Sequence, residues 1–125
     1  MVLTIEPYVF NAPHTLDGNP TLKMAAKRYT DADRGSTDGI TLLLAHGAGS
    51  PLLKAIQDKE QWEPTLDKMF EAQHRKVGAM RIREAWAFDW QNHGDSALIN
   101  RDALHTRPRP ICKRSLIYVS GRSRL

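Results

Sequence analysis

The chain has 125 residues, of which 41% are hydrophobic and 26% are charged, a balance typical of a folded domain and unlike that of a disordered protein. No hydrophobic stretch approaches the roughly 20 residues that cross a bilayer, and the N-terminus lacks the basic start and apolar core of a signal peptide. We therefore expect one modest, soluble domain without a membrane span, inside the cell.

The net charge of +4 arises from the C-terminal part of the chain. Residues 1–100 contain 11 Lys and Arg against 13 Asp and Glu, whereas residues 101–125 contain 7 against 1. Because this tail has Tyr118 as its only aromatic residue and no nucleic-acid-binding signature, solvated charge is the simpler interpretation. We expect no nucleic-acid partner. The single cysteine, Cys112, offers neither an internal disulfide nor a zinc-site pattern.

Two segments with strand-forming residues open the chain. Residues 3–10 alternate apolar and polar side chains, and residues 22–29 do so less regularly. Turn-forming residues lie between them, at 11–13 and 17–20. This arrangement predicts an antiparallel pair of strands.

The next segment is an almost continuous apolar run at residues 40–45 that stops at His46-Gly47-Ala48-Gly49. Such continuity is typical of a parallel strand that is covered on both faces. A buried strand that ends in glycines presents backbone amides to a ligand at its carboxyl end. The run therefore predicts a ligand-binding loop in an α/β fold.

A helix is predicted for residues 59–73, followed by a strand at residues 77–88 that Asp89 terminates. Pro64 suits the first turn of this helix, where its missing N–H costs nothing. The connection is long enough for a parallel crossover between the two strands. The helix should bury one stripe of apolar residues, namely Trp62, Leu66, Met69, Phe70 and Ala72.

The pattern weakens after residues 97–104. Pro108 and Pro110 each remove a helical donor and restrict the residue before them, so any helix here should stop by about His105. Residues 115–120 are predicted as one last short strand.

Three blocks of sequence, taken together, resemble the opening part of an α/β-hydrolase: residues 42–49 (LLLAHGAG), 59–64 (KEQWEP) and 83–96 (REAWAFDWQNHGDS). The similarity is greatest to fungal members, including peroxisomal hydrolases and hydrolases encoded among toxin-biosynthesis genes. The resemblance implies that residues 1–104 are the N-terminal portion of an α/β-hydrolase domain. Its sheet would be incomplete, with two opening antiparallel strands followed by parallel strands with a crossover helix. Residues 105–125 form an irregular, basic, Pro- and Arg-rich tail that departs from the family.

In this family, the loop after the third strand supplies a backbone amide to the oxyanion hole, which stabilises negative charge on a tetrahedral intermediate. Carried onto this sequence, the donor is the Ala48 N–H, with His46, Gly47 and Gly49 shaping the loop. Glycine suits these positions because a Cβ would obstruct the approach of a substrate to the backbone. The alternative interpretation is an ordinary strand-to-helix turn.

The block that begins at Asp89 resembles the family's loop after the fourth strand. For Asp89 and His93 we favour a structural role over a catalytic one. Trp62, Trp86 and Trp90 are expected to be core or pocket-wall aromatics, and they are also candidates for lining an apolar substrate pocket.

The family's nucleophile motif, Gly-x-Ser-x-Gly, does not occur in full in this sequence. The nearest match is residues 121–123, which makes Ser123 the remaining candidate nucleophile. A serine hydroxyl needs a positioned base, and nothing in the sequence places His14, His74 or His105 beside it. Residues 51–58 form an insertion relative to the family, after the glycine loop.

The last three residues, Ser123-Arg124-Leu125, resemble the Ser-Lys-Leu peroxisomal address. This resemblance predicts a peroxisomal import receptor as a partner and the peroxisome as the location. The cytoplasm is the alternative location.

For activity, the resemblance implies an ester or acyl hydrolase that acts on a small apolar carboxylic derivative, in fungal secondary metabolism such as toxin biosynthesis. The alternative is a truncated, noncatalytic remnant or splice product. In that case the third strand would have an unpaired edge, which residues 116–120 are candidates to cover. No cofactor is expected, because no metal cluster, nucleotide-binding fingerprint or flavin motif appears in the sequence.

Overall fold

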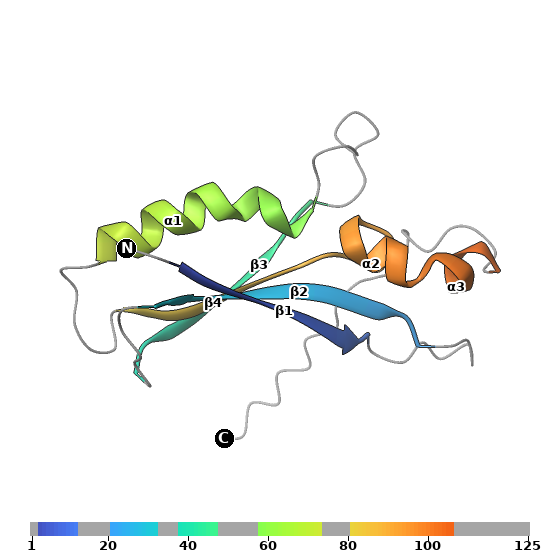
Figure 1. The fold of residues 1–125 in the computed structure, drawn as a ribbon, viewed down its shortest axis with the longest axis horizontal. Helices are drawn as coiled ribbons and strands as arrows, with labels where there is room; N and C mark the ends of the chain where they lie inside the picture. The colour runs from blue at the N-terminus through green and yellow to red at the C-terminus, as the bar shows by residue number, and fades with distance from the viewer. Residues whose placement is uncertain (1–2, 13–20, 33–37, 48–57, 74–80, 107–125) are drawn as a thin grey trace, which may run out of the picture.

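The computed structural model describes residues 3–12, 21–32, 38–47, 58–73 and 81–106, which form a mixed four-stranded sheet with helices (Figure 1). The elements in chain order are β1 (Leu3–Asn11), β2 (Lys23–Asp31), β3 (Ile40–Ala45), the 3₁₀ helix η1 (Lys59–Trp62), α1 (Glu63–Ala72), β4 (Ile82–Phe88), α2 (Gly94–Ile99) and α3 (Arg101–His105).

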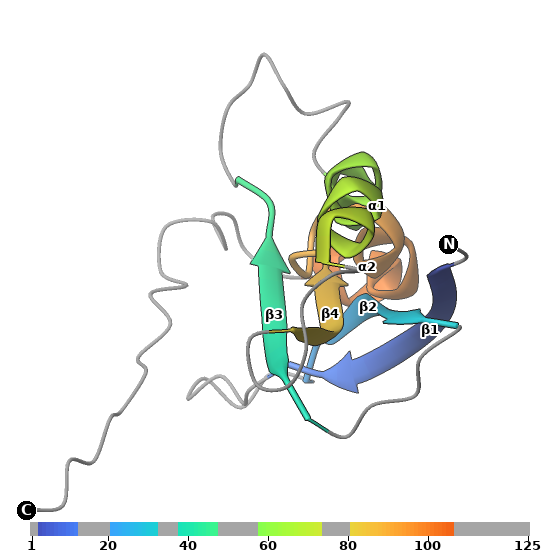
Figure 2. The same ribbon diagram turned by 90° about the vertical axis from the view of Figure 1, so that its left-hand side faces the viewer.

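The strand order is β1-β2-β4-β3. β1 pairs antiparallel with β2, and β2 pairs antiparallel with β4. β3 and β4 are parallel neighbours (Figure 2). Leu43 lies opposite Trp86 in this pair. The predicted antiparallel opening and the parallel pair joined across a helix are therefore confirmed. The fourth strand begins later than expected, at Ile82, and residues 77–80 lie outside the described part of the chain.

The core lies between α1 and one face of the sheet. Leu66 and Phe70 are fully buried and belong to one cluster with Tyr29, Ala85 and Ala87. The two alanines lie on one face of β4 and leave room for the helix to approach closely. Burying each large apolar side chain stabilises the fold by roughly 1.5–3 kcal/mol.

The apolar stripe of α1 is narrower than the sequence suggested. Leu66 and Phe70 are buried, but Met69 is 37% exposed and Ala72 is also exposed. The prediction that these last two residues belong to the buried stripe is wrong. The reason is geometric, because only the helix positions that point directly at the sheet are covered.

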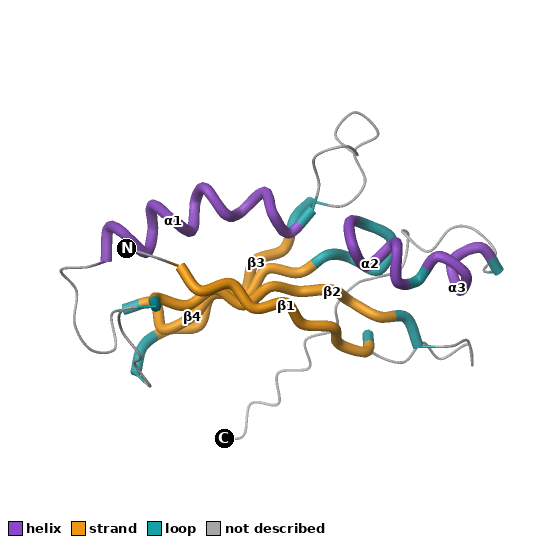
Figure 3. Tube along the Cα trace, viewed as in Figure 1, coloured by secondary structure: helices purple, strands orange, loops and turns teal. Residues whose placement is uncertain are grey.

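The expectation that β3 is covered on both faces is also wrong for the described part of the chain. The described helices lie over one face or beyond the end of the sheet, and none of them lies under the opposite face (Figures 1 and 3). Leu42 and Leu44 pack against the core on the α1 side, whereas Leu43 points the other way and is 73% exposed.

The opposite face of the sheet is aromatic. The Trp86 ring centroid lies 4.8 Å from that of Tyr8 and 5.8 Å from that of Phe10. This face contains an apolar hollow of about 350 Å³, lined by Phe10, Met24, Ala26, Leu43, Trp86 and Phe88. Trp86 therefore lines a pocket, which is one of the two roles predicted for it.

Candidate functional site: the carboxyl edge of β3 and β4

The glycine loop after β3 and the block that begins at Asp89 meet at one edge of the sheet. His46 follows β3, and Asp89 and Trp90 follow β4. Because β3 and β4 are parallel neighbours, their carboxyl ends lie side by side. The Trp90 indole N–H donates to the backbone carbonyl of His46 at 2.9 Å. A long-range side-chain bond therefore joins the ends of the two strands.

The imidazole of His46 is enclosed at this junction, with the residue only 3% exposed. Its Nδ1 lies 2.9 Å from the carbonyl oxygen of Gly47, and its Nε2 lies 3.5 Å from the backbone N–H nitrogen of Trp90. A carbonyl can only accept, so the proton belongs on Nδ1, and Nε2 is left to accept from Trp90. The His93 ring centroid lies 5.0 Å from that of His46.

Asp89 organises the turn between β4 and α2. It is fully buried, and its carboxylate accepts hydrogen bonds from the Lys59 backbone N–H (2.7 Å), the Lys59 ammonium (2.9 Å) and the Asp95 backbone N–H (3.0 Å). Gly94 has a φ of +47°, and a Cβ there would collide with the Asp89 carboxylate. These contacts are those of a structural carboxylate, which ties the start of η1 and the start of α2 to the end of β4.

Lys59 is the residue that sequence reasoning missed. It is 2% exposed, and its ammonium nitrogen lies 2.6 Å from Asp95 Oδ2, 2.9 Å from Asp89 Oδ2 and 2.9 Å from Glu60 Oε1. Burial alone would lower the pKa of Lys59, but the hydrogen bonds to Asp95, Asp89 and Glu60 outweigh burial and raise it above the ordinary value. The ammonium therefore stays charged, and its three N–H groups have three acceptors.

Two polar side chains, that of Ser96 in α2 and that of Asn100 just after α2, continue the hydrogen bonding of β2 past the end of β4. Ser96 Oγ accepts from the Ala25 N–H at 2.8 Å and donates to the Asp89 carbonyl at 3.1 Å. Asn100 pairs with both backbone groups of Lys23, accepting at 2.8 Å and donating at 2.7 Å. The Ser96 and Asn100 side chains thus bond to backbone groups of β2 that a neighbouring strand would otherwise pair with, and they fix α2 against the sheet.

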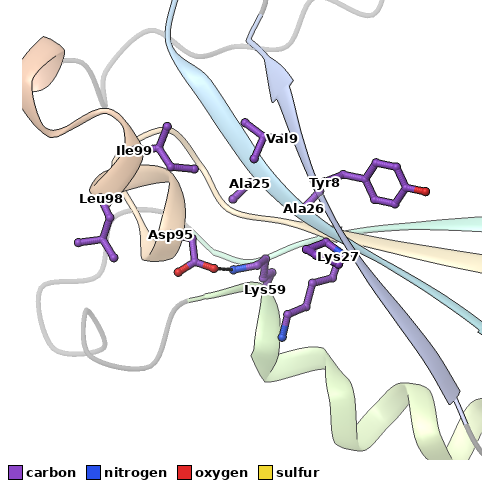
Figure 4. A pocket seen from close by; sticks show the side chains of 10 residues that line it. Tyr8, Val9, Ala25, Ala26, Lys27, Lys59, Asp95, Leu98 and Ile99 are labelled. Carbon is purple, nitrogen blue, oxygen red and sulfur yellow. Dashed lines mark hydrogen bonds and ion pairs between the residues drawn. The ribbon is translucent and has the colours of Figure 1, made fainter.

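A hollow of about 290 Å³ lies beside Lys59 and Asp95 (Figure 4). Figure 4 shows the Lys59 ammonium directed at Asp95, with Leu98 and Ile99 of α2 on one side and Val9 of β1 on another. Most of the lining is apolar. The hollow can accept a small apolar group, and the described residues that line it include no serine or cysteine that could act as a nucleophile.

Several predicted site residues lie outside the described part of the chain. They are Ala48 and Gly49 of the glycine loop, Ser123, Arg124 and Leu125 of the tail, and the histidines His14 and His74. Residues 116–120 lie outside it as well. His105 is described, at the end of α3, where it is exposed. Within the described ranges, no group of three His, Cys, Asp or Glu residues is arranged to hold a metal ion.

Comparison with known proteins gives a likeness among solved structures. No protein-family model matches the chain, and no curated protein matches it. Among solved structures, the chain is similar to the peroxisomal α/β-hydrolase Lpx1 from Saccharomyces cerevisiae, with a TM-score of 0.56 and 26% sequence identity over 79% of this chain. The chain spans 26% of the length of that protein.

The described helices include none long and apolar enough to cross a membrane. The strand order, the parallel β3–β4 pair and the likeness to a solved α/β-hydrolase agree with one another. The chain has the fold of the N-terminal part of an α/β-hydrolase.

Proposed function

We propose that the chain supplies the oxyanion-loop side of a hydrolase active site. The Ala48 backbone N–H, in the loop shaped by His46, Gly47 and Gly49, stabilises negative charge on the carbonyl oxygen of an ester or acyl substrate. The observation that carries this proposal is the 2.9 Å hydrogen bond from Trp90 to the His46 carbonyl. It supports the proposal because it joins the two loops at the strand edge where open α/β sheets bind their ligands.

In the proposed reaction, Ser123 Oγ attacks the substrate carbonyl carbon, and its proton passes to a histidine acting as general base. The carbonyl oxygen gains the negative charge that the loop amide stabilises, and collapse of the tetrahedral intermediate expels the alcohol, which takes the proton from the histidine. Water, deprotonated by the same histidine, then attacks the acyl-serine, and this second collapse releases the carboxylic acid and returns the proton to Ser123 Oγ. The apolar lining of the hollow beside Asp95 supports a small apolar carboxylic derivative as substrate. From the resemblance of the sequence blocks we infer a setting in fungal secondary metabolism, including toxin biosynthesis.

A fluorophosphonate probe and a series of aryl esters test this proposal. The wild-type chain should be labelled at Ser123 and should hydrolyse the short apolar esters, and Ser123→Ala should lose both the label and the turnover. Ser120→Ala is the matched control, because it removes a hydroxyl from the same segment without touching the proposed nucleophile. A wild-type chain that neither reacts with the probe nor turns over any ester contradicts the proposal.

A second candidate function is that of a noncatalytic chain, and one observation favours it. Within the described residues β3 lies at the edge of the sheet, and Leu43 on this strand is 73% exposed. An open, apolar edge strand offers backbone groups for pairing with another chain. Absence of labelling and turnover, together with self-association that depends on Leu43, would support this candidate over the first.

We also propose that Ser123-Arg124-Leu125 is read by a peroxisomal import receptor. The likeness to a hydrolase that is named as peroxisomal supports this location. A fluorescent protein fused to the N-terminus of the chain should appear in peroxisomal puncta, and deletion of Leu125 should disperse it. A diffuse signal from the intact chain contradicts the proposed address.

A further inference from the structure

We propose that the free edge of β3 binds the β3 edge of a second copy of this chain, in antiparallel register about Leu43. The two strands would join two four-stranded sheets into one continuous sheet across a two-fold axis. This inference goes beyond the proposed function, because it names the partner and the register for the open edge. It holds whether or not the chain hydrolyses an ester, since it uses only contacts of β3.

The two edge strands of the described sheet, β1 and β3, differ in their protection against pairing. β1 carries Glu6 and Pro7, a charged residue and a residue without a backbone N–H, and both are typical of edges that stay unpaired. β3 has the sequence Ile-Thr-Leu-Leu-Leu-Ala, with neither a charge nor a proline. The edge of β3 is therefore the one whose sequence suits a neighbouring strand.

The side of β3 that faces away from β4 carries neither a strand nor a helix among the described residues (Figure 2). A strand with one neighbour uses only half of its backbone N–H and C=O groups in the ladder, because alternate residues direct both groups away from that neighbour. Leu43 is 73% exposed, and Thr41 and Ala45 on the same face of the strand are exposed as well. A second strand can therefore approach β3 without displacing any described element.

The sequence of β3 is self-complementary about Leu43. When two identical antiparallel strands are related by a two-fold axis at Leu43, this residue lies opposite its own copy. On the same aromatic face, Thr41 then lies opposite Ala45 of the second copy. On the face that carries α1, Leu42 lies opposite Leu44 of the second copy. Each pair joins two apolar or two small side chains, and none brings like charges together.

Other registers pair less of the strand. The ladder between β3 and β4 is irregular between Ile40 and Thr41, so the regular part of β3 is residues 41–45. An axis at Leu42 would place Leu44 opposite the irregular Ile40 of the second copy. An axis at Leu44 would place Leu42 opposite His46, which follows the strand and is 3% exposed. Only an axis at Leu43 pairs the whole regular segment with itself.

The same pairing extends the apolar hollow on the aromatic face of the sheet. Leu43 and Trp86 both line this hollow, and Leu43 lies on the edge strand. Leu43 of the second copy would lie beside it, with Cβ atoms about 4.5–5.5 Å apart, so both side chains would lose contact with water. An interface built on one short strand pair falls below about 1,200 Å² and is weak. The dimer should therefore form as the concentration rises and dissociate on dilution.

Sedimentation velocity of the full chain, from low to high micromolar concentration, tests the inference. Wild type should pass from monomer to dimer. Leu43→Lys and Leu43→Glu should each remain monomeric, because each substitution places two like charges directly opposite one another. An equimolar mixture of these two variants should dimerise, because lysine then lies opposite glutamate. Val9→Lys is the matched control, since Val9 is 56% exposed on the other edge strand, and it should dimerise like wild type.

A second measurement needs no substitution. In a mixture of isotope-labelled and unlabelled wild-type chains, intermolecular nuclear Overhauser contacts should join Leu43 to Leu43 and Thr41 to Ala45. Intermolecular contacts that join Leu43 to any other segment instead overturn the inference.

Three results of the sedimentation experiment overturn it as well. One is a wild-type chain that stays monomeric at every concentration, and contacts of β3 with residues 116–120 would then identify the same chain as the occupant of the edge. The others are a dimer that survives both Leu43 substitutions and two monomeric variants that fail to associate when mixed. Sedimentation needs no substrate, so a chain without turnover rejects the proposed hydrolase function and leaves the dimer standing.

Discussion

The Trp90 indole N–H donates to the His46 backbone carbonyl at 2.9 Å, and the two residues follow different strands of the sheet. The Trp90 side chain thus joins the segments that follow β3 and β4, beyond the last backbone pair of these two strands. Trp90 belongs to the Asp-Trp-Gln-Asn-His-Gly block, and His46 begins the glycine loop. Four predictions concern this junction and the sheet that carries it.

Trp90→Phe should lower the free energy of unfolding by about 1–2 kcal/mol more than Trp62→Phe does. Both substitutions remove the same atoms. Trp90 loses a hydrogen bond to His46, whereas the buried indole N–H of Trp62 has no hydrogen-bond partner in the described part of the chain. Urea unfolding of the two variants measures the difference. Equal losses of stability would show that the His46–Trp90 bond contributes nothing.

Gly94→Ala should lower the free energy of unfolding by about 2–4 kcal/mol, because it combines an unfavourable backbone conformation with a collision. The φ of Gly94 is +47°, and a Cβ would meet the carboxylate of Asp89. Gly94→Asn is the informative control. Asparagine tolerates this φ better than alanine does, but it carries the same Cβ. If the collision dominates, thermal melting will show no advantage for asparagine, and a clear rescue by asparagine would contradict the account.

Glu84→Gln should cost about 1–2 kcal/mol of stability at neutral pH and almost nothing near pH 2. Burial opposes ionisation of Glu84, but hydrogen bonds from Arg28, Thr41 and Arg83 outweigh it and lower its pKa from 4.5 to about 2. The ionised form is thus favoured by folding, so its contribution is complete above pH 4.5 and is lost as the pH falls toward 2. The loss stays this small because the Arg28 side chain is 34% exposed, so water screens its attraction for Glu84.

Urea midpoints for wild type and Glu84→Gln across this pH range measure the effect. Glu71→Gln on the exposed side of α1 serves as the control and should show a small difference that varies little with pH. A Glu84→Gln penalty that persists unchanged near pH 2 would exclude the ionised hydrogen-bond network as its cause.

Leu43→Thr should reduce aggregation while leaving the stability within about 0.5 kcal/mol of wild type. Leu43 is 73% exposed on the edge strand, so little burial is lost and an apolar contact site is removed. The neighbouring Leu44→Thr is its matched control. Because Leu44 packs against the core, this change should destabilise the chain by about 1–3 kcal/mol without the same gain. Light scattering and urea unfolding distinguish the two, and equal aggregation of wild type and Leu43→Thr would contradict the prediction.

The sheet was largely predictable from the sequence because its strands carry strong local signals. The run at residues 40–45 matches β3, and the glycine loop that follows it marks its end. The antiparallel opening pair and the helix with Pro64 in its first turn follow from alternation and from the special chemistry of proline. These features depend on residues close together in the chain.

What could not be predicted depends on long-range packing. Leu43 is exposed because no described helix covers its face of the sheet. The apolar run alone does not indicate which face of a strand a helix will cover. The burial of Lys59 was missed because lysine is usually solvated, and only its contacts with Asp89 and Asp95 from another part of the chain explain it. A structural role for Asp89 was expected from the resemblance, but its partners were not.

A nuclear Overhauser experiment on the Trp90 indole N–H shows whether the ends of β3 and β4 form one hydrolase-like edge. We expect this proton to contact the protons of His46 and Gly47 and to exchange slowly with solvent, and we expect backbone contacts between Leu43 and Trp86 in parallel register. A rapidly exchanging Trp90 indole without contacts to His46, or an antiparallel pairing of β3 with β4, would contradict the claim that the two strand ends form one hydrolase-like edge.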